Sequence, residues 1–287
     1  MQEITLITFS FGKNYKLSEK HITQLAKNSN FFNNIINYSY EDLDIGFLNK
    51  YSYVMSFPKS FGHSLWKVHL INKTLNASKK DDIVIYMDVG STLNPNGSQR
   101  FWEYIEIINS SNYGNLMFEN PAEYIERAWT TKRLFDYFDI DTDSKFANTP
   151  QLMGGHLLFK NNEHTKNYIK QYMDCLEYDQ KLITDYYNSE KNHQGFIENR
   201  HDQSIWSLLT KSFGGNIIKN ECDFRYREQE QNKYPFLATR HSNQDLLFRT
   251  IFKLFESKAI NTPRYFVPIK AGRFEKKFKK YFYFYGL

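Results

Sequence analysis

The sequence predicts an α/β domain in which helices flank a mainly parallel sheet. From residue 3 onward, segments of strand composition alternate with segments of helical spacing, as in parallel sheets joined by helical crossovers. The chain has 287 residues, with 25 Phe and 21 Tyr to supply a substantial core. The sequence contains no internal repeat and no long low-complexity linker. We therefore expect one domain over residues 1–256 and a tail over 257–287.

β-Branched and aromatic residues, bounded by turn or breaker residues, predict the strands. The first strand ends at a Phe-Ser-Phe-Gly break and the second at Pro58, while the third is an apolar run that stops at Asp88. The later strands continue the alternation with helices. Strands are expected at residues 3–9, 51–57, 82–87, 115–118, 151–159 and 216–218.

Helical spacing of apolar residues predicts the connecting segments. Leu65, Val68 and Leu75 illustrate it in the first helix, which Ser64 can cap. An Asn-Pro-Asn-Gly turn precedes the second helix, and Gly214 stops the fifth. Helices are expected at residues 64–77, 98–109, 121–137, 163–178, 202–212 and 243–256, and the polar stretch 179–199 receives no element.

Composition and charge exclude several classes of protein. Two cysteines, Cys175 and Cys222, are too few for a disulfide scaffold and fit a reducing compartment. The first residues lack the basic and apolar regions of a signal peptide, and no apolar run approaches the ~18 residues of a membrane helix. These features predict a soluble, cytoplasmic protein.

The net charge of +5 is concentrated at one end of the chain. Residues 270–287 contain six basic side chains and one acid, so the remaining chain is neutral and no nucleic-acid partner is indicated. In this tail Phe274, Phe278, Tyr281, Phe282 and Tyr285 recur at helical spacing, with lysines mainly on the other side. The pattern predicts a basic amphipathic helix at a membrane surface. The alternative is a terminal helix that packs on the body or on a second subunit.

The stretch DDIVIYMDVGSTLN, residues 81–94, indicates a functional site. A buried strand ends there on Asp88, and ligands of open α/β sheets bind beyond the carboxyl ends of the strands. Gly90 permits close approach to the backbone. The plainer interpretation is a carboxylate that caps a turn, since turns favour Asp and Gly.

Six motifs in order resemble the glycosyltransferases of the GT-A fold, in particular bacterial and viral capsule-type sugar transferases with an Asp-X-Asp segment. They cover most of the body: FGHSLWKVHLINKTL (61–75), YMDVGSTLN (86–94), AWTTKRLFDYF (128–138), PQLMGGHLLFK (150–160), RHDQSIWSLL (200–209) and PFLATRH (235–241). The resemblance implies a Rossmann-like GT-A sheet of the class predicted above.

The resemblance further implies a glycosyltransferase that moves a sugar from a nucleoside-diphosphate donor, with UDP-sugars favoured, to a glycan or lipid-linked glycan in surface polysaccharide or glycoconjugate synthesis. The leaving diphosphate develops negative charge that a metal ion or fixed cations must meet. Mn²⁺ or Mg²⁺ is the expected cofactor, with Asp88 and His241 as ligands. Gly90 replaces the motif's second acid, so one expected ligand is missing.

Residue by residue, the resemblance also implies the site. Asp202 and Gln203 are expected beside the donor sugar as catalytic residues, and Arg240 matches phosphate with its planar fork. The donor-binding residues are expected to be Thr8, Phe9, Ser10, Lys67, Asp88, Gly90, Ser91 and Arg240. The acceptor-side residues are expected to be Trp129, Lys132, Gly154 and Gly155. The two glycines interrupt a strand, which indicates a close approach by ligand or backbone.

Plainer interpretations of these residues stay open from the sequence. Asp202 can cap the helix that begins there. Lys67 and Lys132 can be solvated side chains on helix faces, and His241 can lie on the surface. At the level of function, the alternatives are a catalytically inactive relative that binds a nucleotide sugar or carbohydrate, and a nucleotidyltransferase, for which the FSFGKNYK loop is a poor phosphate loop.

Overall fold

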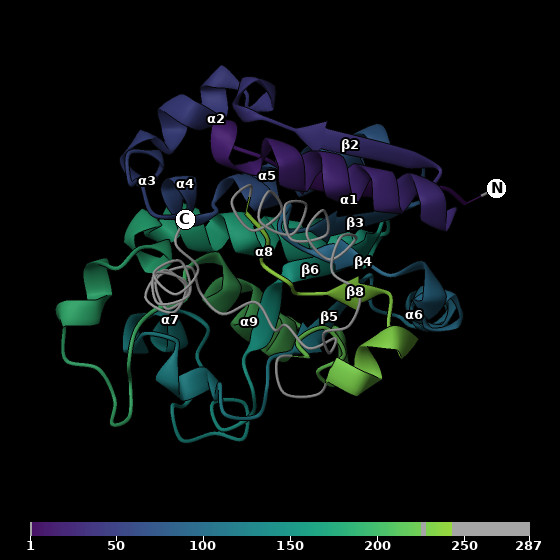
Figure 1. Ribbon diagram of the computed structural model, residues 1–287. Coiled ribbons are helices and arrows are strands. Elements are labelled where there is room, and N and C mark those ends of the chain that lie inside the picture. Colours follow the sequence, from purple (N-terminus) through teal and green to yellow (C-terminus); the bar gives the residue numbers. More distant parts are fainter. Residues whose placement is uncertain (1, 225–227, 243–287) are drawn as a thin grey trace, which may run out of the picture.

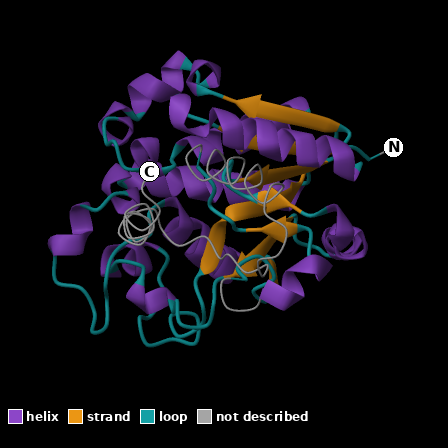
Figure 2. Ribbon diagram, viewed as in Figure 1, coloured by secondary structure: helices purple, strands orange, loops and turns teal. Residues whose placement is uncertain are grey.

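The computed structural model describes residues 2–224 and 228–242, which form a mixed sheet with helices on both faces (Figure 1 and Figure 2). The strand order is β2-β1-β3-β6-β5-β7. Five strands share one direction and β6 runs opposite to its neighbours β3 and β5. The strands are β1 (Ile4–Phe9), β2 (Asn34–Tyr38), β3 (Ile83–Met87), β5 (Asn115–Glu119), β6 (Leu152–Lys160) and β7 (Asn216–Ile218). The expected class, a mainly parallel sheet flanked by helices, is confirmed.

Side chains of the central strands alternate between two cores, one on each face of the sheet. Ile83 and Ile85 of β3 enter the core covered by α1 and α6, while Val84 and Tyr86 enter the core covered by α5, α8 and α9. Both faces are covered, so β3 is buried throughout and reads in the sequence as a continuous apolar run. The helices are α1 (Lys16–Ser29), α2 (Ile45–Lys50), α3 (Ser52–Met55), α4 (Ser60–His63), α5 (Trp66–Ala77), α6 (Ser98–Ser110), α7 (Lys132–Tyr137), α8 (Glu163–Tyr178) and α9 (Asp202–Phe213).

The strand expected at 51–57 is wrong, because this segment is helical and contains α3. Phe47, Tyr51 and Val54 are buried at positions separated by four and three residues, which places them on one helical face. Their aromatic and β-branched composition imitates a strand. The second strand of the sheet is instead β2, which pairs in parallel with β1.

Two other differences concern helices. The helix expected at 121–137 is reduced to α7 and a 3-10 turn at Glu126–Ala128, because Thr131 caps α7 by accepting a hydrogen bond from the Leu134 N–H. Helix α1 was not predicted. It buries Ile22 and Ala26, with Ser18, and presents too few apolar residues for a clear periodic signal.

After β7, residues 228–242 run back toward the central sheet, and a separate two-stranded sheet holds them there. In that sheet β8 (Phe236–Leu237) pairs antiparallel with β4 (Thr92–Leu93), which follows β3 closely. Phe236 is fully buried against Tyr104 and Phe118. Residues 236–242, here called the strap, are thereby held beside the carboxyl end of β3.

The helix expected at 243–256 and the basic tail at 270–287 lie outside the described residues, as does the proposed division at 256. Within residues 2–224 and 228–242, no helix combines the length and the apolar composition that a membrane crossing requires.

Candidate active site

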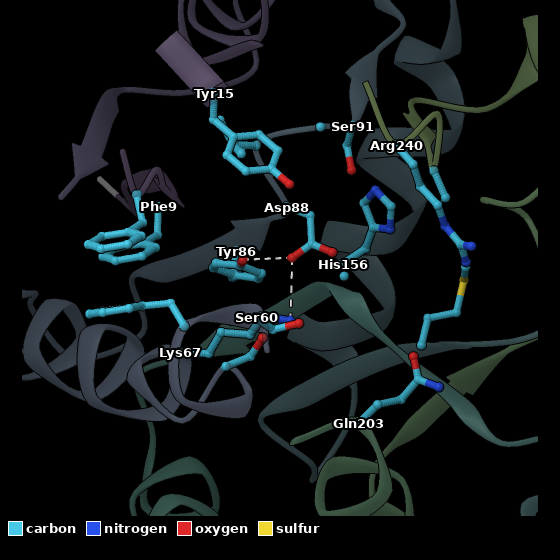
Figure 3. A pocket seen from close by; sticks show the side chains of 18 of the residues that line it. Phe9, Tyr15, Ser60, Lys67, Tyr86, Asp88, Ser91, His156, Gln203 and Arg240 are labelled. Carbon is cyan, nitrogen blue, oxygen red and sulfur yellow. Dashed lines mark hydrogen bonds and ion pairs between the residues drawn. The ribbon is translucent and has the colours of Figure 1, made fainter. Parts of the chain in front are cut away.

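Asp88 lies immediately beyond β3, at the carboxyl end of a central strand, as predicted. Its backbone N–H donates to the Gly155 carbonyl at 2.9 Å, which fixes the start of the loop. The carboxylate is half-exposed, with 51% of the side chain accessible, and it faces a cleft of ≈ 510 Å³ (Figure 3). This volume suits a small-molecule ligand.

Lys67 of α5 brings two carboxylates together at the base of this cleft. Its ammonium lies 2.9 Å from Asp202 Oδ2 and 3.3 Å from Asp88 Oδ1, and it donates to the Gly154 carbonyl at 2.9 Å. Only 6% of the side chain is exposed, so Lys67 is not the solvated lysine of the alternative interpretation. The Tyr86 hydroxyl also donates a 2.7 Å hydrogen bond to Asp88 Oδ1. Figure 3 shows the contacts of Asp88 with Tyr86 and with Lys67.

The pKa values of the three charged groups follow from this arrangement. Burial alone would lower the pKa of Lys67, but the two carboxylates outweigh it and raise that pKa. Burial would raise the pKa of Asp88, but Lys67 and the Tyr86 hydroxyl hold it below its ordinary value. Burial dominates at Asp202 and raises its pKa to about 6, although Lys67 opposes the shift. Asp88 is thus a fixed anion, while Asp202 titrates near neutrality.

Gly154 and Gly155 of β6 leave the space that the two carboxylates need. A Cβ atom at position 155 would lie 2.7 Å from Asp88 Oδ2. A Cβ atom at position 154 would lie 3.3 Å from Asp202 Oδ2 and 3.2 Å from the Gln203 Cβ. The interruption of the strand by glycine therefore serves the site itself.

Gly90 has a similar explanation, and it accounts for the missing second acid. A Cβ atom there would lie 2.8 Å from the His241 carbonyl oxygen and 3.2 Å from the Arg240 carbonyl carbon. The His241 N–H donates to the Gly90 carbonyl at 2.7 Å. The strap therefore occupies the space that a side chain at position 90 would need.

The other predicted residues divide into those at the cleft and those away from it. Phe9, Ser91, Gln203, Arg240 and His241 line the cleft together with Lys67, Asp88, Gly90 and Gly155. Arg240 is exposed, whereas His241 is 2% exposed, so the surface interpretation of His241 is wrong. Gln203 accepts a hydrogen bond from the Gly154 N–H at 3.1 Å.

Asp202 is 6% exposed and lies behind Lys67 rather than on the cleft wall. The N-cap residue of α9 is His201 and not Asp202, and no side chain accepts a capping hydrogen bond there. The capping interpretation of Asp202 is therefore wrong. Thr8 and Ser10 are buried beside the cleft, and the Ser10 hydroxyl donates to Glu19.

The acceptor-side residues Trp129 and Lys132 are not part of this cleft wall. The Arg200 guanidinium lies 4.0 Å from the Trp129 ring centre. Lys132 pairs with Asp136 at 2.6 Å on an exposed helix face, as its plainer interpretation held.

Phe9 was predicted at the cleft, but the aromatic wall to which it belongs was not. The opposite wall is aromatic, with Phe9 stacked on Trp66 and Phe11 stacked on Phe61, each at 4.0 Å between ring centres. Single aromatic residues give no sequence signal that separates a cleft wall from a core, so this wall depends on the tertiary structure.

His156 of β6 was also missed. It is 1% exposed beside Asp88, and within the described chain neither ring nitrogen has a hydrogen-bond partner. Burial lowers its pKa to about 4, so the ring is neutral at neutral pH. A histidine in the buried run MGGHLLF was the available signal.

The protein side chains at Asp88 do not fit a metal ion held by the chain alone. Among His, Cys, Asp and Glu in residues 2–224 and 228–242, a single group of three could hold a metal ion, namely His63, Asp185 and His201. Neither Asp88 nor His241 belongs to it. At Asp88 the cation provided by the chain is the Lys67 ammonium.

No family model matches the chain, and no curated protein matches it. Among solved structures it is similar to a glycosyltransferase involved in glycosylation of the major capsid of PBCV-1, with a TM-score of 0.47, 11% identity and coverage of 82% of this chain and 92% of that chain. It is also similar to an active-site mutant of LgtC, with a TM-score of 0.43, 11% identity and coverage of 77% and 74%. A third structure is the apo glycosyltransferase GlyE of Streptococcus pneumoniae TIGR4, with a TM-score of 0.40, 12% identity and coverage of 92% and 65%.

Proposed function

We propose that the chain transfers a glycosyl group from a nucleoside-diphosphate sugar, with a UDP-sugar favoured, to a hydroxyl of a glycan or lipid-linked glycan. The observation that carries the proposal is the buried Lys67 ammonium between Asp88 and Asp202 at the floor of an aromatic-walled cleft. Such a cleft offers stacking for a base, cations for a diphosphate and carboxylates for sugar hydroxyls.

In this proposal each residue of the cleft has a role that fits its charge and exposure. Arg240 is exposed at the rim, and its guanidinium suits the two phosphates. Asp88 Oδ1 contacts Tyr86 and Lys67, and the half-exposed carboxylate accepts hydrogen bonds from hydroxyl groups of the ribose or the sugar. Gln203 also lines the cleft, and in this proposal it contacts the donor sugar.

In this proposal the Lys67 ammonium stabilises the negative charge that develops on the leaving diphosphate. An ammonium held in place before the reaction needs no reorganisation, and in a site sheltered from water its field is strong. Asp202 does not reach the donor itself and instead sets the position of the Lys67 ammonium. It is therefore a positioning residue in this proposal, and Gln203 is the one of the predicted catalytic pair that meets substrate.

A thermal-shift screen of UDP, UDP-sugars and other nucleotide sugars tests ligand binding, with and without Mn²⁺. A ligand at 100 times its Kd should stabilise the chain by roughly 2.7 kcal/mol. The Asp88→Asn variant should lose this stabilisation, while Asp136→Asn, which removes an exposed carboxylate on α7, should keep it. If none of the nucleotide sugars raises the melting temperature, the proposal is contradicted.

The second candidate is a catalytically inactive relative that binds the same ligands, and Gly90 at the second acid position favours it. A transferase leaks slow cleavage of its donor to water, whereas a binding protein does not. Stabilisation by a UDP-sugar without detectable release of UDP would favour the binding protein.

A further inference from the structure

A second cluster of side chains that can bind a metal ion lies next to residues of the cleft. His63 of α4, Asp185 and His201 each offer one ligand atom, and these three atoms lie within 4.8 Å of one another. His201 Nε2 is 2.8 Å from Asp185 Oδ1, and the His63 and His201 rings are 4.4 Å apart between centres. The three residues come from segments far apart in sequence, so the fold assembles the cluster.

His63 supplies an independent indication of a ligand. It is 1% exposed, and among the described residues neither of its ring nitrogens has a hydrogen-bond partner. A buried polar group without a partner is costly, and native structures rarely leave one without a reason. A metal ion in the cluster would satisfy one of these nitrogens.

We propose that His63, Asp185 and His201 bind a divalent transition metal, for which Zn²⁺ is the best match. Two imidazole nitrogens and one carboxylate oxygen are the donor set that Zn²⁺ prefers, with water in the remaining position. Asn188 donates to Asp185 Oδ1 at 3.1 Å, so the carboxylate already has an outer-shell partner of the kind that metal ligands possess.

The Asp185 side chain is accessible to solvent and already pairs with a cation, the Lys59 ammonium, which a metal ion can replace. The Asp185 side chain is 41% exposed and opens the cluster to solvent. The Lys59 ammonium now lies 3.1 Å from Asp185 Oδ2, and its side chain is 48% exposed. An exposed lysine pair of this kind is weak, so Lys59 can leave as the metal ion arrives.

The backbone at two ligands is unusual for residues other than glycine. His63 has a φ of 52° and His201 has φ 59° and ψ −124°. His63 belongs to a run from Ser60 to Ser64 in which every φ is positive, including Gly62. Left-handed backbone is unfavourable for residues other than glycine, so the surrounding structure must hold this turn in place.

The position of the cluster gives the metal ion a structural consequence. His63 precedes Ser64, which lines the cleft, and His201 precedes Asp202, which pairs with Lys67. A bound ion would tie the left-handed turn and the start of α9 to the loop that carries Asp185. The ion stabilises the backbone next to the cleft and takes no part in chemistry within it.

The test is calorimetric titration of the chelator-treated full chain with Zn²⁺, together with the visible spectrum of the Co²⁺-loaded protein. We expect one ion per chain and a Co²⁺ spectrum typical of tetrahedral coordination. His63→Ala and His201→Ala should each weaken Zn²⁺ binding by more than the roughly 10–100-fold that loss of an outer-shell partner costs. Lys59→Met removes the competing ammonium and should tighten binding.

His69→Ala is the matched control, because His69 contacts Asp44 at 3.1 Å beside Lys73 but has no second histidine in its group. It should leave Zn²⁺ affinity unchanged, as should Asp88→Asn in the cleft. His63→Gln, with a retained circular-dichroism spectrum, separates ligand loss from misfolding. Failure of the wild-type chain to bind Zn²⁺, or equal affinity in His63→Gln and wild type, would overturn the proposal. Neither measurement involves a nucleotide, so the result is independent of the proposed transferase function.

Discussion

Two buried lysines, Lys67 and Lys211, pair with carboxylates, but the two pairs differ in how far the carboxylates are exposed to solvent. Lys211 and Glu126 form a sealed pair at 2.8 Å, with side chains that are 3% and 0% exposed. Lys211 also donates to the Pro150 carbonyl at 2.9 Å. Both carboxylate oxygens of Glu126 accept further hydrogen bonds, from Thr130, Gln151 and Ser207.

The Lys67 pair is open by comparison. The Lys67 side chain is nearly as buried as that of Lys211, but one of its carboxylates, Asp88, is half-exposed on the cleft. The Tyr86 and Lys67 contacts of Asp88 both meet Oδ1, while Oδ2 lies beside Gly155, which has no side chain. A fully satisfied ion pair holds elements together, whereas a buried cation beside an open carboxylate retains capacity for a ligand.

The largest expected effect is on the sealed pair. Lys211→Met should lower the free energy of unfolding by roughly 3–5 kcal/mol, because it leaves the Glu126 carboxylate buried and uncompensated. Chemical denaturation measures this loss. Lys132→Met, which breaks an exposed pair with Asp136, should cost about 0–1 kcal/mol. Similar losses in both variants would contradict the structural role of Lys211.

The open pair should respond in activity instead. Lys67→Met should reduce donor turnover by about 10²–10³-fold, the usual cost of removing one preorganised electrostatic contact. Its loss of stability should be smaller than that of Lys211→Met, because the cleft admits water to Asp88 and Asp202 can take up a proton. The comparison would be reversed if Lys67→Met were as unstable as Lys211→Met and kept wild-type turnover per folded molecule.

Gly155→Ala should produce a smaller effect. The new Cβ atom would lie 2.7 Å from Asp88 Oδ2, so the carboxylate must move and overpacking should cost roughly 1–3 kcal/mol. Turnover should fall through displacement of Asp88. Gly46→Ala is the control, since a Cβ atom there meets nothing within 4 Å and Gly46 lies in α2. Equal kinetics in the two variants would show that the glycine does not serve Asp88.

The pH dependence should be the mildest effect. Asp202 has a pKa of about 6, so its pairing with Lys67 as an anion, and with it turnover, should decline as pH falls through 6. Because the folded pKa exceeds the ordinary 3.8, ionising Asp202 costs stability, and the cost grows from about pH 4 to about pH 6.

The buried histidines act in the opposite direction on stability. His156 and His201 have pKa values near 4, below the ordinary 6.5, so their stabilising contribution is lost as pH falls from 6.5 to 4. The two trends offset each other in part. Activity should therefore decline near pH 6 before the chain unfolds, which parallel rate and circular-dichroism measurements can establish. An unchanged acidic limb in Asp202→Asn would refute the assignment to Asp202.

The sequence predicted the parts of the site that local pattern controls. The apolar run before Asp88 fixed a buried strand and its end, and the glycines of β6 indicated a close approach. It did not predict that Lys67 is buried, because on α5 alone a lysine of this spacing is equally compatible with solvent. That burial arises from two carboxylates brought by β3 and α9.

The misread elements have a similar cause. The segment 51–57 has strand composition, but its buried residues follow a helical period that becomes evident only with Phe47 included. Helix α1 is mostly polar because just one narrow face packs on the sheet. The strap explains Gly90 through a contact with residues 150 positions away, which no local pattern encodes.

The proposed function requires that the open pair at Lys67 and Asp88 assist cleavage of the bond between a sugar and a nucleoside diphosphate. The most direct test is release of UDP from UDP-sugars by purified protein, compared among wild type, Asp88→Asn and the exposed-site control Asp136→Asn. We expect slow release by wild type and by the control, and release at least ~100-fold slower by Asp88→Asn with an unchanged melting temperature. Wild-type release by Asp88→Asn would contradict the account.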